Sequence, residues 1–180
     1  AGATFQRLMD RVTQGLDFQD CYLDDMLVFS DDEDKHVEDI RSILERLREF
    51  GLVLNLEKCE FMQSEVEFLG HRISARGIEP MGRHVESILK FPTPTDLKNL
   101  QSFLGMVNFY RRFIPHAAHM LRPFTDMLKG GSDKAKFVWS SDLDSVFEKV
   151  KKTVAELAPL SHPREGWELS LAVDASNVAA

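Results

Sequence analysis

The sequence predicts an α+β fold, and three observations support this prediction. Amphipathic helical patterns alternate with apolar runs that are too short to be helices. Two of these runs flank an Asp-Asp pair at positions 24–25, as the two strands of a β-hairpin would. A Pro-Thr-Pro segment at 92–94 then separates this mixed region from a mostly helical one, because two prolines interrupt regular structure.

The first 51 residues predict a helix, a hairpin and a second helix. Apolar residues recur at helical spacing over 4–15, and the hairpin follows around 24–25. Ser30 and Glu33 match a capping box that would begin the second helix, and Gly51 supplies the residue that would end it. The expected buried stripe of this helix consists of Val37, Ile40, Leu44, Leu47 and Phe50.

The middle of the chain predicts strands and then helices. Residues 65–73 predict a strand, a turn follows at 76–77, and 78 begins a short return strand. A short helix is expected over 82–91. After the prolines, Thr95 is expected to cap a long helix that ends before Pro115. The buried side of this helix should contain Leu100, Phe103, Leu104 and Val107.

The last third predicts two further helices and a strand. Pro123 fits the first turn of a short helix that ends at Lys129, and Gly-Gly-Ser at 130–132 is a break. Ser140 or Ser141 should cap a helix with Phe147, Val150, Val154 and Leu157 on its buried side. Alternating apolar residues over 169–173 predict a strand that leads to Asp174.

Composition and charge are typical of a globular protein without a membrane-spanning segment. The chain has 180 residues, 43% of them hydrophobic and 28% charged, as in ordinary globular domains. No apolar run approaches the roughly 20 residues needed to span a membrane. The net charge of −7 is unevenly spread: residues 20–67 hold 15 acidic and 5 basic residues, and 98–136 hold 7 basic and 2 acidic. This division fits a metal-binding half and a phosphate-facing half, although two solvated faces would look the same.

The Asp24-Asp25 pair is the most informative feature of the chain. Two carboxylates within an apolar run are costly, because neighbouring like charges resist joint ionisation and each loses water. A hairpin tip that binds Mg²⁺ offsets this cost, since Mg²⁺ prefers carboxylate oxygen. Two such ions about 3.5–4 Å apart can catalyse phosphoryl transfer. The alternative is a plain Asp-Asp surface turn.

Six segments in order resemble the reverse transcriptase of gypsy-type LTR retrotransposons. They are Ala-Thr-Phe-Gln-Arg-Leu-Met at 3–9, Tyr-Leu-Asp-Asp at 22–25, Gly-Leu-Val-Leu-Asn at 51–55 with Lys-Cys-Glu-Phe at 58–61, Phe-Leu-Gly-His at 68–71, Leu-Gly-Met-Val-Asn-Phe-Tyr-Arg-Arg-Phe-Ile-Pro at 104–115, and Val-Asp-Ala-Ser at 173–176. Each segment alone is weakly specific, and their order and spacing together are highly specific.

The resemblance implies a partial right-hand polymerase. Residues 1–91 would form the C-terminal part of the palm, an antiparallel sheet with helices, without the fingers. Residues 92–130 would form the helical thumb, 131–166 a helical tether or connection, and 167–180 the first strand of an RNase H-like domain. The chain would be a fragment of an RNA-directed DNA polymerase within a polyprotein that also contains RNase H and integrase.

The resemblance also assigns the catalytic residues. Asp24 and Asp25 would hold two Mg²⁺ ions for nucleotidyl transfer from a dNTP onto a primer 3′-hydroxyl. Lys58 would be a general acid for pyrophosphate, or a solvated lysine. Asp174 would be the first metal-binding aspartate of RNase H. The third palm aspartate would precede Ala1, so the isolated chain should be inactive.

The residues expected to contact the RNA or DNA template–primer come from three segments. Tyr22 would lie beside the primer end, or would pack across the hairpin. The 68–72 segment would form the primer grip, although a simple bulge at Gly70 is the alternative. In the thumb, Gly105 would allow a sugar to approach, or would serve helix packing. The full set is Tyr22, Phe68, Leu69, Gly70, Gln101, Gly105, Asn108, Phe109, Arg111 and Arg112.

A second function remains open alongside the polymerase. A degenerate or host-adopted retrotransposon remnant could bind nucleic acid or protein without catalysis. In either case the expected location is intracellular, in a cytoplasmic virus-like particle or the nucleus, with no membrane partner. Because exposed sheet edges invite association, the isolated chain is also expected to aggregate or to be only partly ordered after Leu160.

Overall fold

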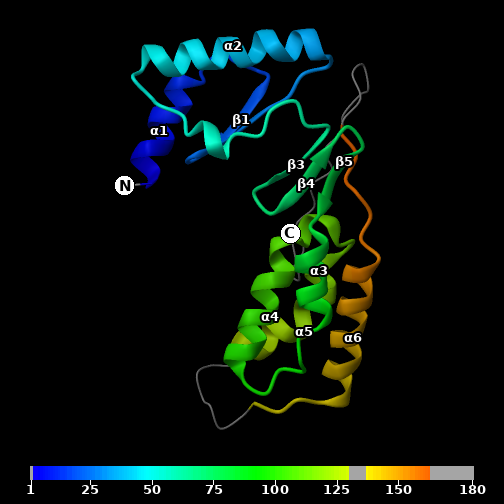
Figure 1. Cartoon of the computed structure of the whole chain (residues 1–180). Coiled ribbons are helices and arrows are strands. Elements are labelled where there is room, and N and C mark those ends of the chain that lie inside the picture. Colours follow the sequence, from blue (N-terminus) through cyan, green and yellow to red (C-terminus); the bar gives the residue numbers. More distant parts are fainter. Residues whose placement is uncertain (1, 130–136, 163–180) are drawn as a thin grey trace. The chain divides into compact units, whose positions relative to one another are not determined.

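The computed structural model describes residues 2–129 and 137–162 and shows a mixture of helices and small antiparallel sheets (Figure 1). The α+β class is therefore confirmed. The chain divides into two compact units, residues 1–69 and 70–180. The strand predicted over 169–173, Asp174 and the expected start of an RNase H-like domain lie outside the described residues.

The first unit consists of two helices around a hairpin. The predicted hairpin is confirmed: β1 and β2 pair in antiparallel register from Gln19 opposite Val28 to Tyr22 opposite Asp25. The elements are α1 (Gly2–Val12), β1 (Gln19–Tyr22), β2 (Asp25–Val28), α2 (Glu33–Glu49), the 3-10 helix η1 (Leu56–Lys58) and β3 (Glu65–Phe68).

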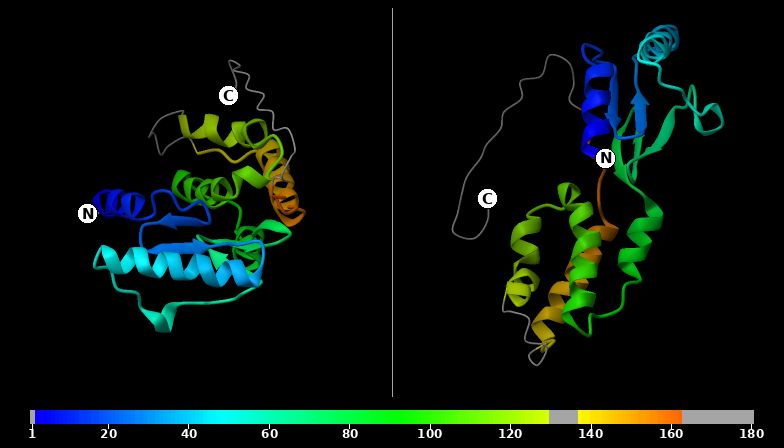
Figure 2. Two further views of the ribbon diagram at one scale, coloured as in Figure 1. Left: turned by 90° about the horizontal axis from the view of Figure 1, so that it is seen from above. Right: turned by 90° about the vertical axis from the view of Figure 1, so that its left-hand side faces the viewer.

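One face of the hairpin packs against both helices of this unit (Figure 2). Side chains alternate between the two faces of a strand, so one face of the β1–β2 ladder carries the apolar residues. The buried cluster consists of Met9 and Val12 from α1 and Ile43 and Leu47 from α2, with Cys21, Met26 and Val28 of the hairpin packed against it. The opposite face of the hairpin carries Asp20, Tyr22, Asp25 and Leu27.

The start of α2 differs from the predicted capping box. Asp32 is the N-cap, and its carboxylate accepts from the backbone N–H of Lys35 at 2.8 Å. Ser30 instead donates its hydroxyl to Asp39 at 2.7 Å. Lys35 also donates to Asp39, at 2.7 Å. These bonds, led by that from Lys35, hold the pKa of the Asp39 carboxyl below its usual value although burial opposes them.

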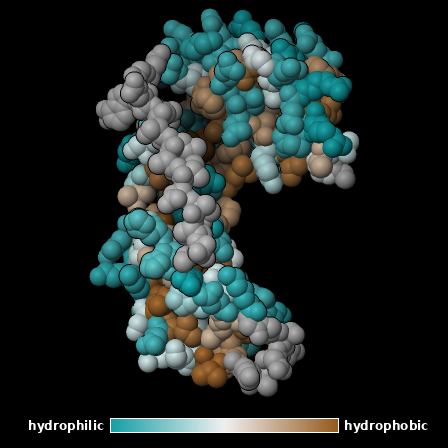
Figure 3. Space-filling view, turned by 180° about the vertical axis from the view of Figure 1, so that it is seen from behind, coloured by the Kyte–Doolittle hydropathy of each residue, from teal (hydrophilic) through white to brown (hydrophobic). Residues whose placement is uncertain are grey.

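The predicted buried stripe of α2 is wrong in part. Val37, Leu44 and Phe50 are 48%, 40% and 42% exposed. The helix turns a different face toward the hairpin, which buries Asp39, Ile43 and Leu47. Tertiary packing therefore selected one of two overlapping apolar faces. Hydrophilic side chains cover much of the outer side of α2 (Figure 3).

The second unit is a group of helices that lie side by side next to a small sheet (Figures 1 and 2). Strands β4 and β5 are antiparallel, with His71 opposite Pro80 and Ser74 opposite Gly77. Its elements are β4 (His71–Ser74), β5 (Gly77–Pro80), α3 (Gly82–Leu89), α4 (Leu97–Phe109), the 3-10 helix η2 (Arg111–Phe113), α5 (Ala117–Lys129) and α6 (Ser141–Ala155).

The helices of the second unit share an aromatic core. Phe103 of α4, Phe124 of α5 and Phe147 of α6 are each fully buried. The ring centroids of Phe103 and Phe147 lie 4.6 Å apart, and those of Phe103 and Phe124 lie 6.2 Å apart. Most of the predicted core residues of the two long helices are buried: Leu100, Phe103, Leu104, Val107, Phe147, Val150 and Val154. Leu157 is the exception, because it follows the end of α6 at Ala155 and is only partly buried.

Several predicted element boundaries after residue 60 are corrected. The strand expected over 65–73 is interrupted at Leu69 and Gly70, which have φ of 47° and 76°. Asp96 rather than Thr95 caps α4, accepting from the backbone N–H of Asn99 at 2.7 Å. Ser140 caps α6 as predicted.

The position of Pro123 also differs from the prediction. Pro123 lies in the interior of α5, which begins six residues earlier at Ala117. A proline there removes one helical hydrogen bond. The helix continues through it because Ala117, Leu121 and Phe124 are all buried in the core.

Candidate functional site

The bend of the β1–β2 hairpin presents the two aspartates. Tyr22 and Asp25 form the last strand pair, so Leu23 and Asp24 alone make the connection. Leu23 has φ of 55°, a left-handed conformation that costs a non-glycine residue about 1–3 kcal/mol. Asp24 and Asp25 are both exposed. The two carboxylates therefore project at a sharp bend, where water or a cation can reach them.

Tyr22 lies on the hairpin face opposite the buried cluster. Side-chain alternation places it with Asp25, its cross-strand partner. The Tyr22 side chain is 56% exposed. This exposure does not support the alternative in which its ring packs across the hairpin, and it leaves the ring available beside the aspartates.

Gln6 of α1 holds the bend in place, a role that the sequence did not indicate. Its side-chain carbonyl accepts from the backbone N–H of Leu23 at 2.6 Å. Its amide nitrogen donates to the carbonyl oxygen of Cys21 at 3.1 Å and to Asp10 at 2.9 Å. The oxygen and the nitrogen of one side-chain amide thus bind the backbone within and just before the strained connection. One feature of the sequence could have indicated this role: Gln6 precedes Met9 by three residues, so both lie on the side of α1 that faces the rest of the unit.

Cys21 contributes a protonated thiol to the same bend. Its sulfur contacts the carbonyl oxygen of Leu23 at 3.7 Å. Burial raises the pKa of the Cys21 thiol, and the negative charges of Asp10, Asp20 and Asp25 raise it further. The raised pKa keeps the thiol protonated at neutral pH, so Cys21 can act as an S–H donor to that carbonyl oxygen.

Replacing Gln6 should loosen the hairpin tip. The change Gln6→Met keeps the length of the side chain and removes both backbone bonds, so we expect the free energy of unfolding to fall by about 1–2 kcal/mol. The amide of Leu23 should exchange with solvent faster, as measured by NMR. Gln14→Met, at an exposed position of the same unit, is the matched control. Unchanged exchange at Leu23 would show that Gln6 does not hold the bend.

The donor chemistry of the bend fits Mg²⁺, but the ligand set is incomplete. Asp24 and Asp25 offer exposed carboxylate oxygens, the ligands that hard cations prefer. Within residues 2–129 and 137–162, no group of three or more His, Cys, Asp or Glu side chains could hold a metal ion. The pair alone could therefore supply only part of a coordination sphere.

Lys58 and Asp174 are the remaining residues of the predicted catalytic and metal-binding set. Lys58 is the last residue of η1 and is exposed. This position is compatible both with a general acid and with a lysine that is only solvated. Asp174 lies outside the described residues.

In the second unit, one face of α4 is exposed over its whole length. Gln101, Gly105, Asn108 and Phe109 are exposed, whereas Phe103, Leu104 and Val107 between them are buried. A Cβ atom on Gly105 would have nothing within 4 Å. Packing against another described helix therefore does not explain this glycine, although glycine within a helix costs about 1 kcal/mol relative to alanine.

Gly70 lies against the aromatic end of α4. A Cβ atom on Gly70 would come within 2.8 Å of the Phe109 ring, and φ at Gly70 is positive. The glycine forms part of a two-residue turn instead of the bulge considered as the alternative. Phe109 is 48% exposed, so its ring both covers Gly70 and reaches solvent. The neighbouring Phe68 is half-buried and Leu69 is 38% exposed.

Arg111 and Arg112 extend the exposed face of α4 beyond its end. Both belong to η2 and both are exposed. Their guanidinium groups carry permanent positive charge and suit phosphate oxygens. The second unit therefore presents amides, a glycine, an aromatic ring and two cations along one helix and the turn after it.

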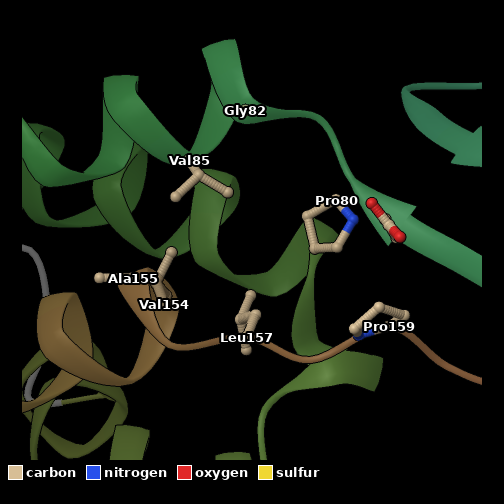
Figure 4. Close-up of a pocket in the computed structure, with 8 residues that line it drawn as sticks. Pro80, Gly82, Val85, Val154, Ala155, Leu157 and Pro159 are labelled. Atoms are coloured by element: carbon tan, nitrogen blue, oxygen red, sulfur yellow. The ribbon is translucent and has the colours of Figure 1, made fainter.

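A small open pocket in the second unit lies away from these residues (Figure 4). Its lining comes from the end of β5, the start of α3 and the end of α6, and is mostly apolar. Pro80, Val85, Val154, Leu157 and Pro159 contribute most of it. The pocket contains none of the predicted site residues, so it is separate from the candidate site.

Among the described helices, none is long and apolar enough to cross a membrane.

Known families and proteins match both parts of the chain. The family described as reverse transcriptase (RNA-dependent DNA polymerase) matches residues 1–73. The Tf2-3 transposon polyprotein of Schizosaccharomyces pombe is 33% identical over 159 residues, which cover 88% of this chain and 12% of that protein. The Pol polyprotein from transposon 297 of Drosophila melanogaster is 36% identical over 99% of this chain and 17% of its own length. The chain thus spans about an eighth to a sixth of these relatives.

Solved structures show the same fold. The foamy viral protease-reverse transcriptase in complex with double-stranded DNA has a TM-score of 0.79 at 23% identity, covering 89% of this chain and 28% of that one. The same viral protein in complex with an RNA/DNA hybrid has a TM-score of 0.76 at 24% identity, covering 89% and 22%. At these identities the similarity establishes the arrangement of the backbone.

Proposed function

Because this chain is a reverse transcriptase region of the LTR-retrotransposon kind, we propose that Asp24 and Asp25 serve an RNA-directed DNA polymerase of which it is a part. The observation that carries the proposal is the hairpin bend. It is a strained two-residue connection, held by Gln6, with both carboxylates exposed. Strain of this kind is found where a structure must present side chains in one arrangement.

The two aspartates would bind divalent metal. Reverse transcriptases generally use divalent metals, and two Mg²⁺ ions are proposed here. Bound metal would lower the pKa of the primer 3′-hydroxyl and offset the charge of the dNTP triphosphate. The chain contributes two carboxylates on a rigid bend, and further ligands would come from elsewhere in the parent protein. Asp174 is proposed to bind metal in the RNase H part.

Tyr22 and Lys58 would act beside this pair. Tyr22 shares the outer face of the hairpin with Asp25, and its exposed ring could contact the primer end or a base. Lys58 is exposed and could donate a proton to departing pyrophosphate if the incoming triphosphate lies near η1. Neither role requires a change in the first unit's backbone.

The exposed face of α4 would follow the template–primer. Gln101 and Asn108 offer hydrogen-bond donors and acceptors, Gly105 lets a sugar approach closely, and Phe109 offers a ring. Arg111 and Arg112 would contact phosphates. The turn formed by Leu69 and Gly70, with Phe68, would hold the primer end. The nucleic acids in the foamy viral complexes support this proposal.

The Gly105→Ala change should affect stability and binding in opposite directions. Since the added methyl group meets nothing within the chain, it should raise the stability of the folded chain by about 0.5–1 kcal/mol. The same methyl group would stand where the sugar approaches and should weaken duplex binding about fivefold or more. Urea denaturation and fluorescence anisotropy with a labelled template–primer measure the two effects.

Ser145→Ala is the control for this experiment, because Ser145 is an exposed serine on α6 and not on the proposed face of α4. It should leave duplex affinity unchanged. Equal affinity of the Gly105→Ala variant and the unaltered chain would contradict the proposed path of the duplex along α4.

The proposed partners follow from the relatives, which are polyproteins. They are the template–primer, the dNTP, and the remaining fingers, RNase H and integrase parts of the parent. The proposed location is an intracellular particle or the nucleus. Primer extension by the parent polymerase, with and without Asp24→Asn, tests the proposal directly. A binding module without catalysis would show duplex binding and no Asp24-dependent extension.

A further inference from the structure

The Tyr110 side chain connects three elements of the second unit. Tyr110 is the C-cap of α4, and only 1% of its surface is exposed. Its hydroxyl donates to the carbonyl oxygen of Gly70 at 3.0 Å. The same oxygen lies 2.8 Å from Nδ1 of His84 in α3. A residue forty positions along the chain thus contacts the glycine that precedes β4.

The number of protons on each group determines which atom donates in the Tyr110–Gly70 and His84–Tyr110 hydrogen bonds. A phenol has one proton to donate, and a carbonyl oxygen can only accept. The proton of Tyr110 therefore points at Gly70, and Nδ1 of His84 must carry the hydrogen that it donates to the Tyr110 oxygen. A backbone hydrogen bond from Met81 also reaches this hydroxyl. Burial raises the pKa of Tyr110, so the phenol keeps its proton at neutral pH.

Aromatic rings hold the next residue of the strand. His71, the first residue of β4, is buried and stacks on Phe109 with ring centroids 5.1 Å apart. It stacks on Phe113 at 5.7 Å and meets Tyr110 edge-on at 5.7 Å. The start of β4 is therefore packed among rings from the end of α4 and from η2. Stacking alone permits sliding, whereas the Tyr110–Gly70 bond has a preferred direction and length.

We propose that Tyr110 is a positioning residue whose hydroxyl fastens Gly70 and the start of β4 to the end of helix α4. This inference rests on the proposed function, in which Gly70 belongs to the primer-holding turn and α4 follows the duplex. Because of this bond, the turn at Gly70 and helix α4, which would each contact nucleic acid, belong to one rigid body. His84 completes the arrangement by holding the Tyr110 oxygen from α3.

Hydrogen exchange of the chain measures this connection without any ligand. Tyr110→Phe keeps the ring and removes the hydroxyl, which leaves the Gly70 carbonyl and the His84 N–H without this partner. We expect the amides of residues 70–74 to exchange about tenfold faster. The amides in the middle of α4 should keep their protection, because the core of α4 is unchanged. Tyr22→Phe, at the only other tyrosine of the sequence, should leave exchange at 70–74 unchanged.

Variants of His84 give a second measurement in which Tyr110 itself is unchanged. His84→Ala removes the Nδ1 donor and should increase exchange at 70–74. His84→Asn places an amide N–H near the position of Nδ1 and should restore most of the protection. Unchanged exchange in both Tyr110→Phe and His84→Ala, with both chains folded, would overturn the proposal.

Duplex binding links the connection to the proposed function. With a hairpin template–primer as the probe, Tyr110→Phe should weaken binding several-fold. The dependence of affinity on salt should stay the same, because the phosphate contacts remain. An altered salt dependence with unaltered exchange would count against the positioning role. A complete lack of binding by the unaltered chain would instead reject the proposed function of the second unit, and exchange would still decide the role of Tyr110.

Discussion

The Asp24→Asn change is expected to lower primer extension by the parent polymerase about a thousandfold or more. Metal ions supply several kcal/mol of transition-state stabilisation in such reactions, and each 1.36 kcal/mol corresponds to a factor of ten in rate. Asparagine has nearly the same shape as aspartate but no charge. The change therefore removes an anionic metal ligand without removing bulk from the hairpin.

The exposure of Asp24 makes this result interpretable. Because Asp24 is exposed at the bend, replacing it should not disturb the buried cluster beneath the hairpin. The melting temperature should accordingly stay within a few degrees. Asp31→Asn, at another exposed aspartate of the same unit, removes the same charge away from the bend and should leave extension unchanged. Full extension by the Asp24→Asn enzyme would refute the role proposed for this carboxylate.

The Phe103→Ala change is expected to lower the stability of the second unit by about 3–5 kcal/mol. Phe103 is fully buried and contacts the rings of Phe91, Phe124 and Phe147, which come from different helices and a loop. Removing the ring loses its transfer free energy and leaves a cavity that rigid neighbours fill only in part. Because domains are stable by only about 5–15 kcal/mol, the loss is large.

Trp139 provides the measurement for this change. Its ring stacks on Phe124 at 5.8 Å and meets Phe147 edge-on at 5.8 Å, so its fluorescence reports the same core. Urea unfolding followed at Trp139, in a Trp167→Phe background, should shift to a lower midpoint. Gln101→Ala, an exposed change on the same helix, should shift it little. A shift for Phe103→Ala no larger than that for Gln101→Ala would mean that the core is not organised around this ring.

Much of the architecture could be predicted because local patterns and tertiary packing agree. Around Asp24-Asp25, two short apolar runs with a polar connection allow few structures other than a hairpin, and β1 and β2 form it. In α4, the apolar residues at helical spacing, including Phe103, are all buried. The exposed polar residues between them, such as Asn108, follow from the same periodicity.

Predictions failed where the sequence permits two similar local solutions. Ser30 and Asp32 are both good N-cap residues, so the sequence allows either of them to cap α2. In the structure the Ser30 hydroxyl donates to the buried Asp39 instead, and Asp32 is the N-cap. Val37 and Leu44 form an apolar line of their own on α2. Only the position of the hairpin beneath the helix determines that Ile43 faces inward instead.

The order of residues along this chain is enough to predict that its main helices and its hairpin form, and to predict the Asp24-Asp25 bend and the exposed face of α4, because these follow from spacing within a few residues. The bonds from Gln6 to Leu23 and from Tyr110 to Gly70 join residues seventeen and forty positions apart. No local pattern encodes such pairs. They arise when packed elements bring a donor and an acceptor within hydrogen-bond distance, and they place the strained turns on which the proposed chemistry depends.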